Sequence, residues 1–165
     1  AAIAAGLAGL GIEDTTANPA KPIHDFDHAV KRLQAAAKAA RGRIILTGRT
    51  DNFINGRPDL DDTVKRLVAF AEAGADVLFA PGLPDMAAIR TVVKAVSPKP
   101  VNVVVGPGVV LAVPREAGVK RVSIGGELYS KALTETRECL GELAQGKLDT
   151  AFKGVMPSGE FGRML

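Results

Sequence analysis

Residues 43–82, RIILTGRTDNFINGRPDLDDTVKRLVAFAEAGADVLFAPG, contain a complete strand–helix–strand unit. The first nine residues of this stretch are rich in branched side chains and too short for a long helix, which is typical of a buried strand. A helix is predicted over 58–74, where Asp59 caps the start and Gly74 ends it. Its apolar stripe consists of Val64, Leu67, Val68 and Ala71. The next strand is predicted in 75–82.

The same alternation continues on both sides of this unit. Further strands are predicted in 9–14, 100–106 and 121–126, and further amphipathic helices in 26–42, 84–97 and 128–144. Strands this apolar, separated by helices, are buried on both faces and run parallel. The pattern therefore predicts an α/β fold, either an open doubly wound sheet or a (β/α) barrel.

Chemically active groups follow the predicted strands. In both architectures, binding and catalysis gather at the carboxyl ends of the strands. There the sequence places Glu13 and Asp14 after the first strand, and Arg49, Thr50 and Asp51 after the second. Two acids after a buried strand are suited to holding a metal or an acid/base group.

Composition limits the classes of function. The chain has 165 residues, 47% of them hydrophobic, and a net charge of +3 that is spread along its length. It lacks a basic cluster, has few aromatic residues and has no apolar run long enough to cross a bilayer, so we expect neither nucleic-acid nor membrane binding. Its single cysteine, Cys139, cannot form a disulfide within the chain. We expect a cytoplasmic protein.

Three segments in this order carry a family resemblance: GIEDTTANPAKPIHDFDHAVKRL (11–33), LTGRTDNFINGRPDLDDTVKRLVAFAEAGADVLFAPGLPD (46–85) and KPVNVVVG (99–106). Together they resemble the isocitrate lyase/phosphoenolpyruvate mutase superfamily. These enzymes make or break C–C or P–C bonds in small oxo acids or carboxylic acids with Mg²⁺. The resemblance covers nearly the whole chain.

The resemblance also implies the fold. The family fold is a (β/α)₈ barrel, which takes about 250 residues. This chain matches the fourth to the eighth strands, so it is expected to form an incomplete TIM-type barrel and a single domain over 1–165. The strand that carries the family's aspartate cluster, which holds magnesium, has no counterpart here.

Site residues follow from matching the family motifs. Glu13 matches a glutamate that reaches Mg²⁺ through a bound water, and Asp14 matches a commonly acidic position with a less definite role. Arg49 matches the arginine that binds the substrate carboxylate or phosphonyl group. Without the resemblance, Glu13 reads as a strand-end acid paired with a nearby cation, and Arg49 reads as a salt-bridge partner of Glu13 or Asp51.

Departures from the family narrow the reaction. The cysteine-containing loop of isocitrate and methylisocitrate lyases is replaced by TTANPAKPIHDF (15–26), and Pro81 stands where those lyases have a glutamate. The loop better resembles the oxaloacetate decarboxylase and phosphonomutase branches. Lys21 lies in the gating-loop region, but no role follows for it.

Other polar and glycine-rich positions leave their alternatives open. Asn102 lies within a strand, with no assignable role. The glycines at 106–108 and 125–126 suit either phosphate binding or tight turns. His24 and His28 are four residues apart, although two solvated histidines explain that spacing better than a metal site.

Two functions of different class remain at this point. One is a Mg²⁺-dependent lyase or mutase acting on an oxaloacetate- or phosphonopyruvate-like acid. The other is a truncated, inactive barrel fragment with a structural or assembly role. Family members resembling this chain form homotetramers through their C-terminal helices. The apolar tail residues fit a partner surface or a tail folded over its own barrel: Leu148, Phe152, Val155, Met156 and Phe161.

Overall fold

The computed structural model describes residues 1–40, 42–107 and 112–164. The chain divides into two compact units, Ala1–Ser123 and Ile124–Leu165. Within the described residues, all five strands lie in the first unit, and the second unit is helical. Glu13, Asp14 and Arg49 belong to the first unit, whereas the glycines at 125–126 belong to the second.

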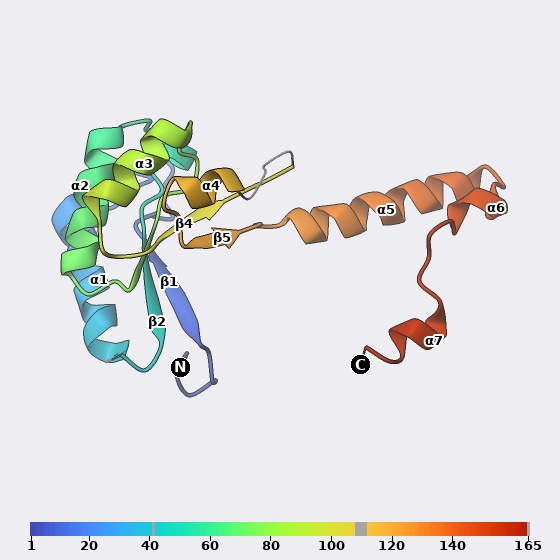
Figure 1. The fold of residues 1–165 in the computed structure, drawn as a ribbon, viewed down its shortest axis with the longest axis horizontal. Coiled ribbons are helices and arrows are strands. Elements are labelled where there is room, and N and C mark those ends of the chain that lie inside the picture. Colours follow the sequence, from blue (N-terminus) through green and yellow to red (C-terminus); the bar gives the residue numbers. More distant parts are fainter. Residues whose placement is uncertain (41, 108–111, 165) are drawn as a thin grey trace. The chain divides into compact units, whose positions relative to one another are not determined.

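The first unit is built on a parallel sheet whose strands pair in sequence order (Figure 1). The strands are β1 (Gly9–Glu13), β2 (Ile45–Arg49), β3 (Val77–Phe79), β4 (Val101–Val104) and β5 (Arg121–Ser123). Each strand is hydrogen-bonded to its neighbour along the chain. The reversal of strand order that defines a doubly wound sheet does not occur among the described strands. The α/β class is confirmed, and this order fits part of a barrel.

Helices cover one face of this sheet. They are α1 (Phe26–Ala40), α2 (Leu60–Glu72), α3 (Met86–Ala95) and the short α4 (Ala112–Glu116). The Asp59 side chain accepts a hydrogen bond from the Asp62 N–H at 2.9 Å, so the predicted cap is confirmed. Gly74 follows α2 with a φ of +107°, as expected of a helix terminator. The 3₁₀ turn η1 (Phe53–Asn55) and α4 were not predicted from the sequence.

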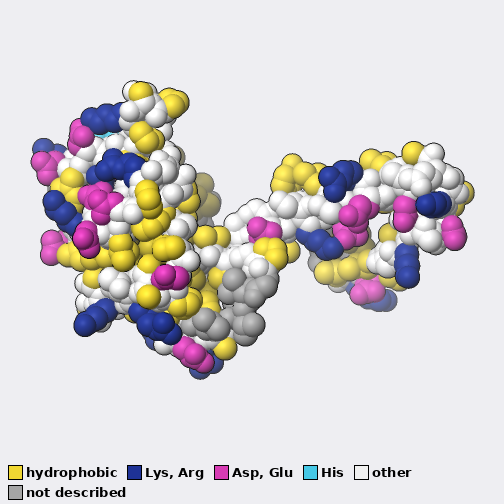
Figure 2. Space-filling model, turned by 90° about the horizontal axis from the view of Figure 1, so that it is seen from above, with side chains coloured by type: hydrophobic (Ala, Val, Ile, Leu, Met, Phe, Trp, Pro, Cys, Tyr) yellow, Lys and Arg dark blue, Asp and Glu magenta, His cyan; other side chains and the backbone are white. Residues whose placement is uncertain are grey.

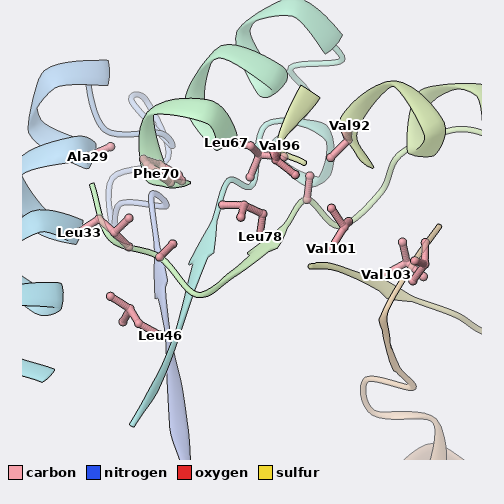
Figure 3. Packing of buried hydrophobic residues seen from close by; sticks show 13 residues of the cluster. Ala29, Leu33, Leu46, Leu67, Phe70, Leu78, Val92, Val96, Val101 and Val103 are labelled. Atoms are coloured by element: carbon pink, nitrogen blue, oxygen red, sulfur yellow. The ribbon is translucent and has the colours of Figure 1, made fainter. Parts of the chain in front are cut away.

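The core lies between the sheet and these helices (Figure 3). Side chains alternate along each strand, so Leu46, Leu78 and Val101 point toward the helices and are at most 1% exposed. Leu67 and Phe70 of α2 meet them from the helix side and are equally buried. This packing fixes which strand residues face the opposite side.

The opposite face of the sheet is polar at several positions. It carries Thr47 of β2 and Arg121 of β5, although two strands lie between them. The Arg121 NH1 lies 3.5 Å from the Thr47 Oγ1. The long arginine side chain thus reaches across this face from the fifth strand to the second.

The second unit contains α5 (Glu127–Ala144), α6 (Leu148–Ala151) and α7 (Ser158–Phe161). Helices α5 and α6 contact each other, and Ala151 is buried. The apolar tail residues singled out in the sequence are all exposed: Leu148, Phe152, Val155, Met156 and Phe161. On the face seen in Figure 2, basic and acidic side chains alternate without forming one charged patch. No helix in the described part of the chain has the length and apolar character needed to cross a membrane.

A glycine in β2 makes the core packing testable. A Cβ placed on Gly48 would lie 2.9 Å from the Phe70 Cβ and 3.1 Å from the Ala75 Cβ, neither of which is a flexible side-chain end. Gly48→Ala should therefore lower the free energy of unfolding by about 1–3 kcal/mol through overpacking, measured by urea denaturation. Gly11→Ala is the control, because the nearest atom to its Cβ is the Thr47 carbonyl oxygen at 4.0 Å. Equal losses in the two variants would contradict this account.

Candidate functional site

Glu13 and Arg49 end adjacent strands and lie opposite each other in the β1–β2 register. The Arg49 NH1 forms an ion pair with the Glu13 Oε1 at 3.0 Å, and the Arg49 Nε donates to the Asp51 Oδ1 at 2.6 Å. The structure thus joins the two predicted residues at the carboxyl end of the sheet. Arg49 pairs with Glu13 and with Asp51 at the same time, which are the two salt bridges expected for it in the absence of substrate.

The Arg49 guanidinium is oriented by an aromatic ring as well as by acids. Its Cζ lies 5.3 Å from the centroid of the Phe79 ring, and Phe79 pairs with Arg49 in the β2–β3 register. Such stacking favours a fixed plane for the guanidinium. Of its five N–H groups, the one on Nε donates to Asp51, whereas NH1 lies 3.0 Å from the Glu13 Oε1, and the side chain is 25% exposed. The geometry suits a two-pronged contact with a planar anion.

Asp14 lies in a different environment from Glu13. It is buried, its Oδ1 accepts from the Asp51 N–H at 2.9 Å, and its Oδ2 accepts from the Arg66 NH1 at 3.2 Å. Adjacent strand residues point to opposite faces, so Asp14 is not brought into the Glu13–Arg49 cluster. Both of its oxygens are already engaged by protein donors.

Asp51, which the sequence offered as a possible salt-bridge partner of Arg49, is that partner, and its burial and its contact with Thr15 were not predicted. Its side chain is almost fully buried between the Arg49 Nε and the Thr15 Oγ1, which donates to the Oδ2 at 2.6 Å. The only available signal was its position two residues after Arg49 at a strand end. The buried Asp51 carboxylate therefore fixes the orientation of the partly exposed Arg49 guanidinium.

The segment after β1 folds back as a short hairpin, residues 15–24. Thr15 and Ile23 form an antiparallel bridge, and the Thr16 N–H donates to the Pro22 carbonyl at 2.7 Å. Lys21 lies near the tip and pairs with Asp25 at 2.6 Å, and both side chains are more than half exposed. In this arrangement Lys21 contacts a surface acid, and its contact is separate from the Arg49 cluster.

The remaining candidates form no metal centre in the part of the chain described. His24 and His28 have ring centroids 4.7 Å apart, and burial together with the charges of Arg32 and His28 lowers the pKa of His24. No group of three His, Cys, Asp or Glu side chains that could hold a metal occurs among the described residues. Of the acids near Arg49, only Glu13 has a side chain that is about half exposed.

Asn102 and the glycine segments lie farther along the sheet. Asn102 is buried, its Nδ2 donates to the Ser123 Oγ at 3.0 Å, and its Oδ1 has no partner among the described residues. Gly125 has a φ of +54°, which fits a tight turn before α5. The phosphate-binding alternative for 106–108 includes Gly108, which lies outside the described residues.

The fold and this cluster define an α/β protein with a parallel sheet and an arginine paired with two carboxylates at the carboxyl ends of its strands. The chain belongs to the phosphoenolpyruvate phosphomutase family, whose model matches residues 1–144, and thereby to the isocitrate lyase/phosphoenolpyruvate mutase superfamily. The superfamily predicted from the sequence is confirmed.

One curated relative and two solved structures illustrate this membership. An oxaloacetate decarboxylase from Paraburkholderia xenovorans is 33% identical over 162 residues, covering 91% of this chain and 52% of the relative. The crystal structure of a presumed lyase/mutase from Burkholderia cenocepacia is 42% identical, with a TM-score of 0.91 over 98% of this chain and 60% of that one. A 2,3-dimethylmalate lyase is 25% identical, with a TM-score of 0.81 over 96% of this chain and 58% of that one. The chain thus spans about half the length of the curated relatives it matches.

Proposed function

We propose that this chain forms part of an enzyme that breaks or makes a C–C or P–C bond in a small oxo acid, with an oxaloacetate- or phosphonopyruvate-like acid as substrate. The observation that carries the proposal is Arg49, which is held between Glu13 and Asp51 and stacked on Phe79 at the strand ends. The names of its relatives as lyases, a decarboxylase and a phosphomutase support the same chemistry.

Arg49 would bind the substrate carboxylate or phosphonyl group. Its plane is set before binding, so little rotational freedom is lost when the anion arrives. An arriving anion would share the guanidinium with Asp51 and displace or reposition Glu13, the more exposed of the two acids. Arg49, held by Glu13 and Asp51, would thus contribute to catalysis by orienting the oxo acid at the strand ends.

We propose Mg²⁺ as the cofactor. Glu13 fits a ligand that reaches the ion through water, because it is a half-exposed carboxylate at the strand end. The described residues supply no complete ligand set, and Asp14, with both oxygens engaged, is better assigned as a positioning residue than as a ligand. When bound, Mg²⁺ would stabilise the enolate that bond cleavage generates.

The comparisons do not favour the alternative of an inactive structural fragment. We further propose a homo-oligomer, with a tetramer as the expected form. The support is the set of exposed apolar side chains of the second unit.

The proposal is tested on the naturally encoded protein. Oxaloacetate and phosphonopyruvate are supplied with Mg²⁺ or with EDTA. Pyruvate release is followed with oxaloacetate, and formation of phosphoenolpyruvate or of pyruvate and phosphate is followed with phosphonopyruvate. Turnover of one of these acids should require the cation, and oxalate, a planar dicarboxylate that mimics the enolate, should inhibit competitively. Titration calorimetry with oxalate and Mg²⁺ provides the second measurement. A folded protein that neither turns over these acids nor binds oxalate would refute the proposal.

A further inference from the structure

Arg66 of α2 is a buried arginine that joins three separate segments. Its side chain is 4% exposed. Its NH1 lies 3.2 Å from the Asp14 Oδ2 and donates to the His24 carbonyl at 3.0 Å, while its Nε donates to the Asp62 Oδ2 at 2.7 Å. One guanidinium therefore connects the end of β1, the return arm of the hairpin 15–24 and its own helix.

A continuous chain of contacts leads from Arg66 to Arg49. Asp14 accepts from Arg66 with one oxygen and from the Asp51 N–H with the other, at 2.9 Å. The Asp51 carboxylate then accepts from the Arg49 Nε at 2.6 Å. The backbone position of Asp51, and through it the direction of Arg49, depends on where Asp14 is held.

The same guanidinium also closes the base of the hairpin. The His24 N–H donates to the Asp14 carbonyl at 2.8 Å, and the His24 carbonyl accepts from Arg66. Thr15, the first residue of the hairpin, donates to Asp51. The hairpin and the Arg49 cluster thus share one anchor.

Asp62 holds the other side of this arginine. Burial would raise the pKa of Asp62, but the hydrogen bonds from Arg66 and from the Asn52 Nδ2 outweigh it and hold the pKa below its usual value. The acid therefore remains charged at neutral pH and fixes the guanidinium plane. A lysine ammonium also has three N–H donors, but all are on one nitrogen, so it could not reproduce contacts made from both the Nε and the NH1 of a rigid guanidinium.

We propose that Arg66 is a positioning residue for the anion site: through Asp14 and Asp51 it aims Arg49, and through His24 it holds the hairpin 15–24 against that site. Buried ion pairs often contribute little net stability compared with apolar replacements. Geometry is what such a pair supplies here. The inference about Arg49 rests on the proposed function, whereas the inference about the hairpin does not.

Amide hydrogen exchange measured by NMR tests the anchor directly. In Arg66→Met, exchange at the Asp51 and His24 amides should accelerate at least about tenfold, consistent with loss of roughly 1.4 kcal/mol of local protection. The Leu78 amide, which donates to Pro100 within the sheet, should be unaffected. Arg66→Lys, which keeps the charge, should restore protection only in part. Arg57→Met is the matched control, since Arg57 is exposed and lies 3.8 Å from the same Asp62.

Oxalate affinity, measured by calorimetry with Mg²⁺, provides the functional readout. It should fall about tenfold in Arg66→Met and stay at the parental value in Arg57→Met. If the Arg66 variant lost only global stability, with local exchange and oxalate affinity unchanged, Arg66 would be a structural residue and the proposal would be overturned. A parent protein that does not bind oxalate would instead refute the proposed function and leave the exchange test intact.

A charge-neutral variant covers the case in which Arg66→Met does not fold. The double change Asp14→Asn/Arg66→Met removes the buried carboxylate that would otherwise be left unpaired. The side-chain amide that it introduces keeps an oxygen that can accept from the Asp51 N–H. We expect faster exchange at both the His24 and the Asp51 amides, because no guanidinium holds the His24 carbonyl or the side chain of residue 14. Parental exchange at His24 in this double variant would also overturn the proposal.

Discussion

Replacing Arg49 with lysine is expected to lower turnover of the oxo acid, and affinity for oxalate, by about a hundredfold. Lysine keeps the positive charge but cannot contact Glu13, Asp51 and a planar anion with a single rigid fork. It also loses the flat face that lies over the Phe79 ring. The fold should persist, because the core packs on the other face of the sheet.

The control for this prediction is Arg43→Lys. Arg43 precedes the opposite end of the same strand, where its side chain donates to the Ala39 and Ala40 carbonyls at the end of α1. Steady-state kinetics and calorimetry should give parental values for this variant. If Arg49→Lys behaved in the same way, Arg49 would not be the anion-binding group.

Replacing Glu13 with glutamine should raise the Mg²⁺ concentration needed for half-maximal activity by about 10- to 100-fold. The change removes one negative charge that would act on the metal through water, and the side-chain shape is kept. The ion pair with the Arg49 NH1 is weakened as well, but Asp51 still orients that arginine. Titration of activity with Mg²⁺ at saturating oxo acid measures the effect.

Excess Mg²⁺ should separate the two variants. It should restore much of the activity of Glu13→Gln and none of the activity of Arg49→Lys, since only the first change affects the metal. Glu72→Gln, at the exposed end of α2, is the matched control and should leave the Mg²⁺ requirement unchanged. Equal rescue of both variants would show that the two assigned roles are wrong.

Local signals in the sequence predicted the fold well. The alternation of branched strands and amphipathic helices gave the α/β class, and Asp59 and Gly74 marked the ends of α2 because capping and a positive φ depend on nearby residues. The family motifs pointed to Glu13 and Arg49, which the structure places in direct contact.

Long-range polar contacts were not predictable in this way. Arg66 lies in the stretch VKRLV, where a basic residue on an amphipathic helix normally faces water. Its partner Asp14 is 52 residues earlier in the chain. The hairpin 15–24 was also not predicted, because a segment with two prolines and two threonines among ten residues is typical of an irregular loop. Whether a charged residue is buried depends on the tertiary fold, so the local sequence pattern around Arg66 could not predict it.

Because the base of the hairpin 15–24 is closed, its tip can change in sequence and length while the base stays in place. Its ends are fixed by the Asp14–His24 backbone hydrogen bond and by Arg66, whereas the tip residues 17–21 lie beyond the last paired residues. Once the ends of a loop are held, doubling its length costs only about 0.6 kcal/mol of closure entropy. Tips of different length and chemistry can therefore be exchanged on the same base without changing the contacts that hold Arg49.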